Sequence, residues 1–247
     1  MNNSRALVIV PTYNERENLA ALVAAILTAD PELHLLIVDD NSPDGTGELA
    51  DALAQAHRQM HVLHRPGKAG LGAAYRAGFE YALAQGYEFI IEMDADFSHN
   101  PADLPRLIAP ARAGIADLVL GSRWAAGGGT RGWPLHRRLI SRGGSRYART
   151  ILRMPVRDLT GGFKCFRRRV LETLDLAAVK TSGYGFQIEL TYRARQAGFR
   201  VREIPIIFTE RQRGQSKMSG RIVTEALLMV WRLRFPRLAA TVAREPA

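Results

Sequence analysis

The chain has 247 residues, of which 47% are hydrophobic and 23% are charged, and its formal net charge at pH 7 is +10. This length and composition exclude a disordered chain and are typical of a globular protein with one large core. The single cysteine, Cys165, excludes an internal disulfide, and the lack of ~18–20 consecutive apolar residues excludes a bilayer-spanning segment.

The charge is divided unevenly along the chain. Residues 1–100 contain 6 Lys and Arg against 14 Asp and Glu, a net charge of −8, whereas residues 101–247 contain 28 against 10, a net charge of +18. An acidic part suits a metal ion, and a basic part suits phosphates, an anionic membrane surface or nucleic acid. Arginines scattered for solubility would give the same count.

Strand-like and helical segments alternate over the first half of the chain. Short apolar runs predict strands at residues 6–10, 33–38, 60–64, 87–93 and 118–121. The spacing of apolar positions between them predicts helices at residues 16–28, 47–59, 71–85 and 102–113. We therefore expect an α/β fold with a mostly parallel, Rossmann-like sheet that helices cover on both faces.

After residue 121 this alternation stops. The sequence there predicts a Gly-rich loop at residues 127–129, a basic helix at 135–153, a helix near 186–196 and a strand at 201–208. No linker or internal repeat divides the chain. We expect one domain over residues 1–220 and an amphipathic C-terminal helix or tail over residues 221–247.

Carboxylates follow three of the predicted strands. Glu15 follows the first strand, Asp39 and Asp40 follow the second, and Asp94 and Asp96 follow the fourth. The carboxyl ends of parallel strands meet at one edge of a sheet, where α/β proteins bind ligands, and Asp oxygens suit Mg²⁺ or Mn²⁺. An isolated Asp-X-Asp pair is also typical of turns and helix caps.

Residues 13–17 and 70–75 each match part of a known local motif. Asn14 and Glu17 have the spacing of a capping box that would open the first helix, which leaves Tyr13 and Glu15 to contact a base at the sheet edge. Residues 70–75 do not fit a dinucleotide fingerprint, because the sixth position is a tyrosine, nor a phosphate-binding loop, because the lysine precedes the glycines. We read them as a tight loop that opens a helix.

Five motifs, in order and spacing, resemble family 2 glycosyltransferases of the A-type fold. They are Val10–Glu15, Val38–Thr46, Gly70–Gly72, Asp94–His99 and Gly121–Arg123. The resemblance covers about residues 5–220. Within the family the chain is most similar to dolichol-phosphate or polyprenol-phosphate mannose synthases, through Gly121–Trp124, through Trp133 and Pro134 with Arg137 and Ser141, and through residues 211–217.

The resemblance implies a catalytic domain that transfers mannose from GDP-mannose to a polyprenyl or dolichyl phosphate, with inversion and with Mg²⁺ or Mn²⁺. A relative that moves glucose or N-acetylglucosamine from a UDP-sugar to lipid phosphate or another acceptor stays open as the alternative. We expect a cytoplasmic protein that is peripheral at the membrane face, with or without a separate anchoring protein. Nucleic acid is not an expected partner, because no RNA or DNA motif occurs.

The resemblance also implies roles for particular residues. The donor site comprises Pro11, Tyr13, Glu15, Val38, Asp40, Asp94, Ala95, Asp96, Arg123, Arg211 and Lys217. The acceptor-phosphate site comprises Arg123, Arg137 and Ser141, and the catalytic residues are Asp94, Asp96 and Arg123. The metal ligands are Asp94, Asp96 and Ser98, although a serine hydroxyl is a weaker ligand than the glutamine of some members.

The chemistry of a phosphate acceptor bears on two acidic residues. A phosphate monoester has a second pKa of about 6 and is already an anionic nucleophile at neutral pH, so the site does not need a general base. Asp158 has two interpretations, a base as in relatives with hydroxyl acceptors or a turn residue before two glycines, and we favour the turn. Glu189 receives no role.

Basic residues recur along the predicted helix 135–153. Their spacing places them on one side of that helix, and they are Arg138, Arg142, Arg146, Arg149 and Arg153. This stripe either is a solvated surface or lies against anionic lipid headgroups. The tail, residues 222–238, mixes apolar residues with arginines, so it either lies in a membrane interface or packs against its own domain.

Overall fold

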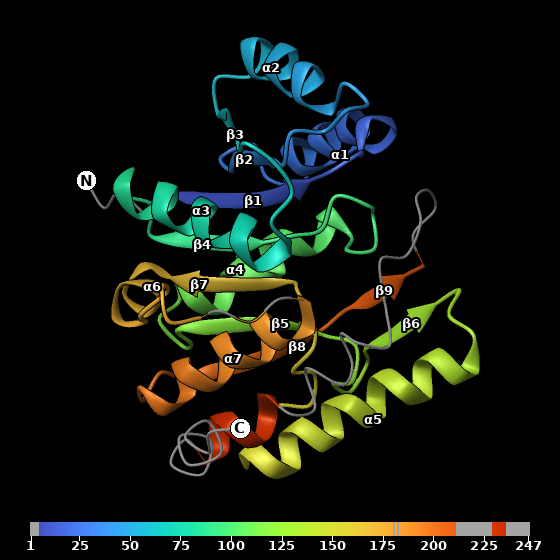
Figure 1. Cartoon of the computed structure of the whole chain (residues 1–247), viewed down its shortest axis with the longest axis vertical. Helices are drawn as coiled ribbons and strands as arrows, with labels where there is room; N and C mark the ends of the chain where they lie inside the picture. The colour runs from blue at the N-terminus through green and yellow to red at the C-terminus, as the bar shows by residue number, and fades with distance from the viewer. Residues whose placement is uncertain (1–4, 180, 182, 211–228, 236–247) are drawn as a thin grey trace, which may run out of the picture.

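The structure is a computed structural model that describes residues 5–179, 181, 183–210 and 229–235. Its strands are β1 (Ala6–Thr12), β2 (His34–Asp39), β3 (Met60–His64), β4 (Phe89–Glu92), β5 (Leu118–Ser122), β6 (Gly129–Arg131), β7 (Lys164–Arg167), β8 (Val201–Pro205) and β9 (Ile207–Thr209). Its α-helices are α1 (Arg16–Ala29), α2 (Thr46–Ala56), α3 (Leu71–Ala84), α4 (Leu104–Arg112), α5 (Leu135–Leu152), α6 (Arg168–Thr173) and α7 (Gly183–Gln196), with a 3-10 turn, η1 (Pro101–Asp103), before α4 (Figure 1).

A seven-stranded sheet in the order β3-β2-β1-β4-β7-β5-β8 forms the centre of the fold. Its neighbours are parallel except β7, which runs antiparallel to both β4 and β5. The predicted mostly parallel sheet is therefore confirmed. The carboxyl ends of β1, β2, β4 and β5 and the amino end of β7 meet at one edge.

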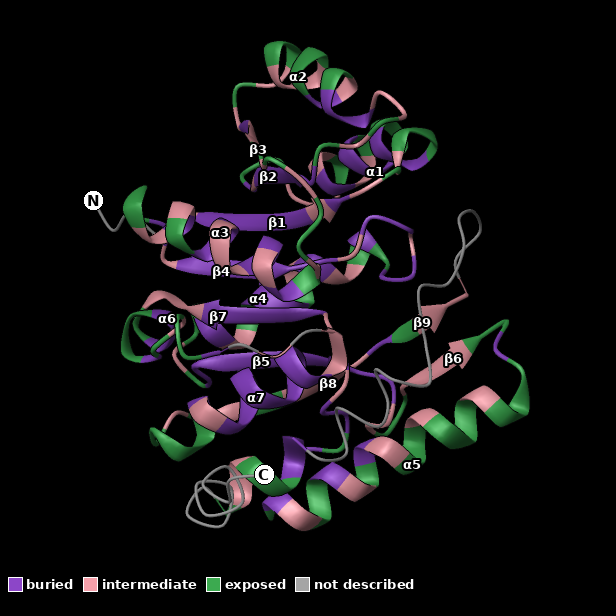
Figure 2. Ribbon diagram, in the orientation of Figure 1, coloured by how far each residue is buried: buried purple, intermediate pink, exposed green. Residues whose placement is uncertain are grey.

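Helices cover both faces of this sheet, as predicted. Alternate side chains of β1 point to opposite faces: Leu7 and Ile9 join a core with α3, α5 and α7, whereas Val8 and Val10 join a core with α1 and α4. Figure 2 shows the strands buried between these layers, while the outer sides of α2 and α5 are exposed. The short apolar runs are thus strands buried on both faces.

Two predictions for local structure are wrong. The single strand expected at residues 201–208 is two strands, because β8 pairs with β5 and β9 leaves the sheet to pair with β6. The capping box is also wrong: Glu15 is the N-cap of α1 and makes no capping hydrogen bond with its side chain. Asn14 instead has φ 60° and donates its backbone N–H to Ser42 Oγ at 3.1 Å.

The small sheet of β6 and β9 continues from the carboxyl edge of the main sheet. Ile206 joins the two sheets, since its N–H donates to Ser122 O at 3.1 Å and its carbonyl accepts from Gly129 N at 3.0 Å. Figure 1 shows β6 and β9 side by side near the start of α5. This extension places the start of α5 near the carboxyl edge of the main sheet.

Part of the C-terminal segment packs against the domain. Met229 and Val230 are buried in the core that includes α5 and α7, and Trp231 Nε1 donates to Tyr147 Oη on α5 at 2.8 Å. Trp231 and Phe235 remain exposed. Within the described residues, no helix is both long and apolar enough to cross a membrane.

Candidate functional site

The ends of β1 and β2 lie side by side at the carboxyl edge. Pro11 and Val38 are direct partners in the parallel register, so the segments that follow them, with Tyr13 and Asp40, are neighbours. Lys68 Nζ lies 4.3 Å from the centroid of the Tyr13 ring. The structure therefore brings together most of the residues predicted for the nucleotide. It also places the charged amine of Lys68 beside the ring of Tyr13.

The two aspartates after β2 have different partners. Asp39 accepts hydrogen bonds from Thr12 Oγ1 at 2.9 Å and from Ser42 N and Oγ at 3.0 and 2.6 Å, so it shapes the turn. Asp40 pairs with Arg65 Nη1 at 2.5 Å. Burial raises the pKa of Asp40, and the charge of Arg65 opposes this rise.

The remaining carboxylate of this group, Glu15, is partly held by its own helix. Its Oε2 accepts from Asn18 Nδ2 at 2.9 Å, and its backbone N–H donates to Thr46 Oγ1 at 3.0 Å. The second bond joins the start of α1 to the start of α2. Glu15 is therefore held in place directly after β1, at the carboxyl edge of the sheet.

The loop after β4 carries the predicted metal ligands. Asp96 Oδ1 accepts the N–H of Ser98 at 3.1 Å, and Phe97 between them has φ 58°. Ser98 is buried, and its hydroxyl has no hydrogen-bond partner among the described residues. A buried hydroxyl without a partner is costly, and it suggests a ligand that the protein alone does not supply.

These three residues fit a divalent cation. Asp94, Asp96 and Ser98 offer hard oxygen atoms from one tight loop, as Mg²⁺ and Mn²⁺ prefer. No group of three or more His, Cys, Asp or Glu side chains suited to a metal occurs in the part of the chain that the structure describes.

His99 supports this loop, a role that sequence reasoning missed. Its Nδ1 accepts the backbone N–H of Asp94 at 3.3 Å, and its ring stacks on Phe163 at 4.9 Å and meets the edge of Phe208 at 5.2 Å. Burial lowers the pKa of His99 to about 4, so the ring is neutral and can accept this bond. A neutral, buried histidine thus fixes the backbone of Asp94.

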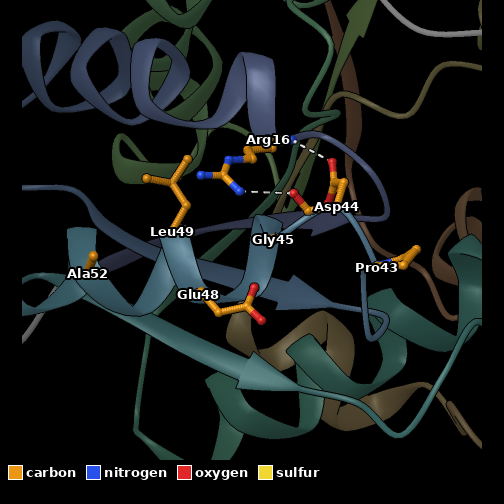
Figure 3. Close-up of a pocket in the computed structure, with 7 residues that line it drawn as sticks. All are labelled: Arg16, Pro43, Asp44, Gly45, Glu48, Leu49 and Ala52. Carbon is orange, nitrogen blue, oxygen red and sulfur yellow. Dashed lines mark hydrogen bonds between the residues drawn. The ribbon is translucent and has the colours of Figure 1, made fainter.

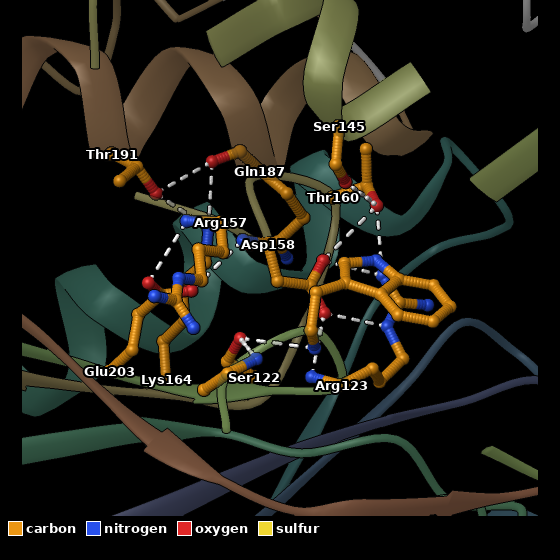
Figure 4. A network of polar contacts seen from close by, with 12 residues as sticks. Ser122, Arg123, Ser145, Arg157, Asp158, Thr160, Lys164, Gln187, Thr191 and Glu203 are labelled. Carbon is orange, nitrogen blue, oxygen red and sulfur yellow. Dashed lines mark hydrogen bonds and ion pairs between the residues drawn. The ribbon is translucent and has the colours of Figure 1, made fainter. Parts of the chain in front are cut away.

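Arg123, at the end of β5, is held by Asp158 (Figure 4). Its Nε and Nη2 donate to the two Asp158 oxygens at 2.7 Å each, and Nη2 also donates to Thr160 Oγ1 at 2.8 Å. Burial would raise the pKa of Asp158, but the charge and hydrogen bonds of Arg123 outweigh this effect and lower it. Asp158 is therefore an ionised partner of Arg123, which neither the turn nor the base interpretation anticipated.

An aromatic cluster joins Arg123 and Arg137 to the loop of Asp94. The guanidinium carbon of Arg123 lies 5.4 Å from the centroid of Phe208, the ring that contacts His99, and 5.5 Å from that of Trp133. Arg137 lies on Trp133 at 4.2 Å. The loop of Asp94 and the predicted acceptor arginines are therefore parts of one packed cluster.

The first turns of α5 carry the other predicted acceptor residues. Arg137 Nη1 donates to both carboxylate oxygens of Glu210, to Oε1 at 2.6 Å. Ser141 lies one turn further along the helix and is half-buried. Arg211 and Lys217, predicted for the donor diphosphate, lie outside the described residues.

A buried acid and a buried base, which the sequence analysis did not single out, lie on neighbouring strands close to the loop of Asp94. Glu92 and Lys164 are paired across β4 and β7, and both are fully buried. Lys164 Nζ donates to Gln187 O at 2.7 Å and to Thr191 Oγ1 at 3.0 Å. Burial raises the pKa of Glu92 to about 8 and lowers that of Lys164 to about 8, while each charge opposes the effect on the other.

One more acidic residue and one surface hollow lie outside the predicted site. Glu189, left without a role, accepts hydrogen bonds from Thr181 Oγ1 and Arg193 Nε, both at 2.8 Å.

An open hollow of about 590 Å³ lies beside the N-terminus of α2 (Figure 3). It is lined by Arg16, Pro43, Asp44, Gly45, Glu48, Leu49 and Ala52, and none of these residues was predicted for the site.

The chain was compared with known proteins. The glycosyl transferase family 2 model matches residues 7–175. A polyprenol monophosphomannose synthase of Mycolicibacterium smegmatis is 52% identical over 93% of this chain and 88% of its own. An undecaprenyl-phosphate mannosyltransferase of Micrococcus luteus is 48% identical over 92% of this chain and 93% of its own.

The fold is similar to that of a solved glycosyltransferase. The glucosyl-3-phosphoglycerate synthase of Mycobacterium tuberculosis, solved with Mn²⁺, UDP and glucosyl-3-phosphoglycerate, aligns with a TM-score of 0.65 and 19% identity. The alignment covers 96% of this chain and 80% of that one. This likeness confirms the predicted A-type fold.

Proposed function

This chain belongs to glycosyl transferase family 2, and from that membership we propose that it transfers mannose from GDP-mannose to a polyprenyl phosphate. The names of the two relatives at 52% and 48% identity support both the sugar and the lipid-phosphate acceptor. The observation that carries the proposal is the cluster in which the Asp94 loop meets Arg123 and Arg137 through His99, Phe208 and Trp133.

The donor side of this proposal uses the edge formed by β1, β2 and β4. Pro11, Tyr13, Glu15, Val38 and Asp40 would hold the nucleotide, and the Lys68 cation beside Tyr13 suits the adjoining phosphates. Asp94, Ala95 and Asp96 would face the diphosphate, and the Asp94, Asp96 and Ser98 oxygens would hold Mg²⁺ or Mn²⁺. A cation held there would offset the negative charge that develops on the departing diphosphate.

The acceptor side uses cations. Arg123, Arg137 and Ser141 would bind the lipid phosphate, and the charges of the two arginines would offset the repulsion between the acceptor and donor phosphates. A phosphate monoester is already ionised at neutral pH because its second pKa is about 6. Attack therefore needs no general base, and Asp158 supports this view because its two oxygens are engaged by Arg123.

The stereochemical outcome follows from this arrangement. The phosphate oxygen would attack the anomeric carbon from the side opposite the departing diphosphate, so the configuration inverts and an α-linked donor gives a β-mannosyl phosphate. Arg211 and Lys217 complete the donor site in this proposal on the strength of the family resemblance alone. The same holds for the division into a catalytic domain over residues 1–220 and a tail over residues 221–247.

We also propose that the protein docks on a membrane surface through the outer side of α5. Leu135, Leu139 and Ile140 are exposed there, and the arginine stripe continues along the helix. A lipid-phosphate acceptor keeps its reactive group at the level of the lipid headgroups. An apolar and basic helix beside Arg137 suits that position.

One experiment tests the reaction directly. The purified protein is incubated with membranes, a divalent cation and a panel of labelled GDP- and UDP-sugars, and the label that enters an acid-labile lipid fraction is measured. We expect incorporation from GDP-mannose alone. Incorporation from UDP-glucose or UDP-N-acetylglucosamine would replace the proposed donor, and no incorporation from any sugar would contradict the proposed function.

A further inference from the structure

Arg137, one of the two arginines proposed to bind the acceptor phosphate, is paired with the carboxylate of Glu210. Glu210 follows β9 directly, and both of its oxygens accept hydrogen bonds from Nη1 of Arg137. A phosphate that binds Nη1 of Arg137 would therefore compete with an anionic group of the protein. Two anions that compete for one guanidinium nitrogen cannot both bind it fully.

The two acceptor arginines differ in how firmly their carboxylate partners are held. Asp158 is fully buried and accepts three bonds from Arg123, from its backbone N, Nε and Nη2. The side chains of Arg137 and Glu210 are 22% and 31% exposed. Buried pairs are costly to break, whereas partly exposed pairs contribute little to stability. The Asp158 pair is therefore permanent, and the Glu210 pair is exchangeable.

Arg137 keeps its place without Glu210. Its guanidinium lies 4.2 Å from the centroid of Trp133, a ring that is itself buried and meets the edge of Phe208 at 5.2 Å. The face of an aromatic ring attracts a cation through its quadrupole. When the carboxylate leaves, the ring holds the guanidinium ready for another anion.

The backbone fixes Glu210 at this position. Its N–H donates to Arg131 O at 2.8 Å, which continues the pairing of β6 with β9. Gly132, with φ +81°, lies against Glu210 so closely that an added Cβ would come within 2.9 Å of the Glu210 Cβ. The left-handed turn at Gly132 thus makes room for this carboxylate beside Arg137.

We propose that Glu210 is a specificity-determining residue that competes with the acceptor phosphate for Arg137. This inference rests on the proposed function. A phosphate monoester carries about −1.5 to −2 charges at pH 7 and a carboxylate carries −1, so a phosphate displaces Glu210. A lipid with a singly charged head group gains too little from the exchange, and Glu210 thereby selects dianionic acceptors.

The test compares the wild type with Glu210→Gln, which removes the charge and keeps the shape. We expect the KM for a water-soluble prenyl phosphate to fall about two- to fivefold, the range that a partly exposed ion pair allows, while the KM for GDP-mannose stays unchanged. Direct calorimetric binding of the same prenyl phosphate without donor should strengthen by the same factor. The difference should shrink as NaCl is raised.

Two control variants isolate the effect. Glu88→Gln removes the partner of Arg167 in a pair of matching exposure, 25% and 32%, at the opposite edge of the sheet, and it should leave both KM values unchanged. Glu210→Asp keeps the negative charge and should retain the wild-type KM for prenyl phosphate.

Three results would overturn the inference while transfer by the wild type still stands. They are an unchanged KM for prenyl phosphate in Glu210→Gln, a raised KM, which would show that Glu210 positions Arg137 for the phosphate, and an equal fall in Glu88→Gln. A wild type that binds prenyl phosphate but transfers no mannose would contradict the proposed function instead.

Discussion

At the scale of single residues, the pair of Arg123 and Asp158 shows how a motif residue depends on a distant one. The two are 35 positions apart, and Asp158 also receives the backbone N–H of Arg123 at 3.0 Å. Glu203 in turn accepts the backbone N–H groups of Arg157 and Asp158, both at 2.9 Å. Arg123 is thus fixed by Asp158, and Asp158 by Glu203 on β8.

Asp158→Asn should therefore act through Arg123. Loss of one partner of a buried ion pair costs about 3–5 kcal/mol, so we expect a lower free energy of unfolding and a higher KM for the acceptor. Urea denaturation and steady-state kinetics measure both. If the variant instead keeps its stability and donor affinity but loses all turnover, Asp158 is a general base and the mechanism without a base is wrong.

Ser98→Ala separates a metal ligand from a structural serine. A buried hydroxyl without a partner carries a desolvation penalty, so its replacement should raise the free energy of unfolding without metal by about 1 kcal/mol. If Ser98 contacts the cation, the same change should weaken Mn²⁺ binding several-fold, measured by calorimetry. Unchanged Mn²⁺ affinity would remove Ser98 from the proposed ligands.

Sequence reasoning found some of the site residues and missed others for a physical reason. Asp94, Asp40 and Arg123 follow strands, and that position is readable from apolar runs. The supports are not readable in this way. His99 contacts Asp94 within one tightly folded loop, and Glu210 contacts Arg137 73 positions away, so both roles depend on a fold that the sequence pattern does not give.

At the scale of elements, α5 is confirmed as a helix, and the five arginines of its stripe are all exposed. Apart from exposed Leu135, Leu139 and Ile140, the apolar side chains of α5 turn inward, and Ala148 and Leu152 are buried. The two sides of the helix thus serve different contacts. The inner side joins the core, and the outer side remains available for a lipid surface.

The membrane proposal predicts the outcome of flotation with anionic liposomes at physiological salt. We expect the wild type to float with the liposomes, Leu139→Asn to float less, and Arg142→Glu with Arg146→Glu to stay in solution. Ile115→Asn changes an exposed apolar residue between α4 and β5 and serves as the control. A wild type that stays in solution would contradict docking through α5.

The strand β7 was missed because its signal is weak. It has four residues, Lys164 to Arg167, and a charged residue stands at each end. Its partners explain how it can be central: Lys164 is buried beside Glu92, and Cys165 and Phe166 fill the two cores. Lys164 can be buried in a strand because Gln187 and Thr191 accept its hydrogen bonds, and these partners are distant in the sequence.

At the scale of the whole molecule, the uneven charge of the sequence has a structural counterpart. The carboxylates of the acidic part gather at the ends of β1, β2 and β4, and the basic part supplies Arg123, Arg137 and the stripe on α5. One sheet edge therefore separates a side suited to a cation from a side suited to phosphates. The sequence analysis predicted the uneven charge and the carboxylates at the strand ends, but not the strand order that places Arg123 beside them.

Charged residues also link β5, α6 and β8 to one another. Asp117, next to β5, is buried and accepts bonds from the Arg200 backbone N–H at 2.9 Å, from the Arg200 side chain and from Arg169 Nη2. Burial would raise the pKa of Asp117, but the hydrogen bonds of the two arginines outweigh it and place it well below its ordinary value.

Asp117→Asn should therefore destabilise the protein in a way that depends on pH. A lowered pKa means that the aspartate contributes stability above about pH 4, its ordinary pKa, and loses this contribution as the pH falls further. We expect a deficit of about 2–3 kcal/mol at pH 7 that shrinks below pH 4, measured by urea denaturation. A deficit that is constant between pH 7 and pH 3 would contradict this assignment.

The place of β7 between β4 and β5 has a consequence for how the protein is made. A nascent chain on the ribosome can join β1, β2, β3 and β4 early, but β5 has no partner until β7 emerges more than 40 residues later. Sheets closed by such distant segments assemble late. The two parts of the sheet on either side of β7 therefore complete their folding together, and a shortened chain that ends before β7 would leave the edges of β4 and β5 unpaired and prone to aggregation.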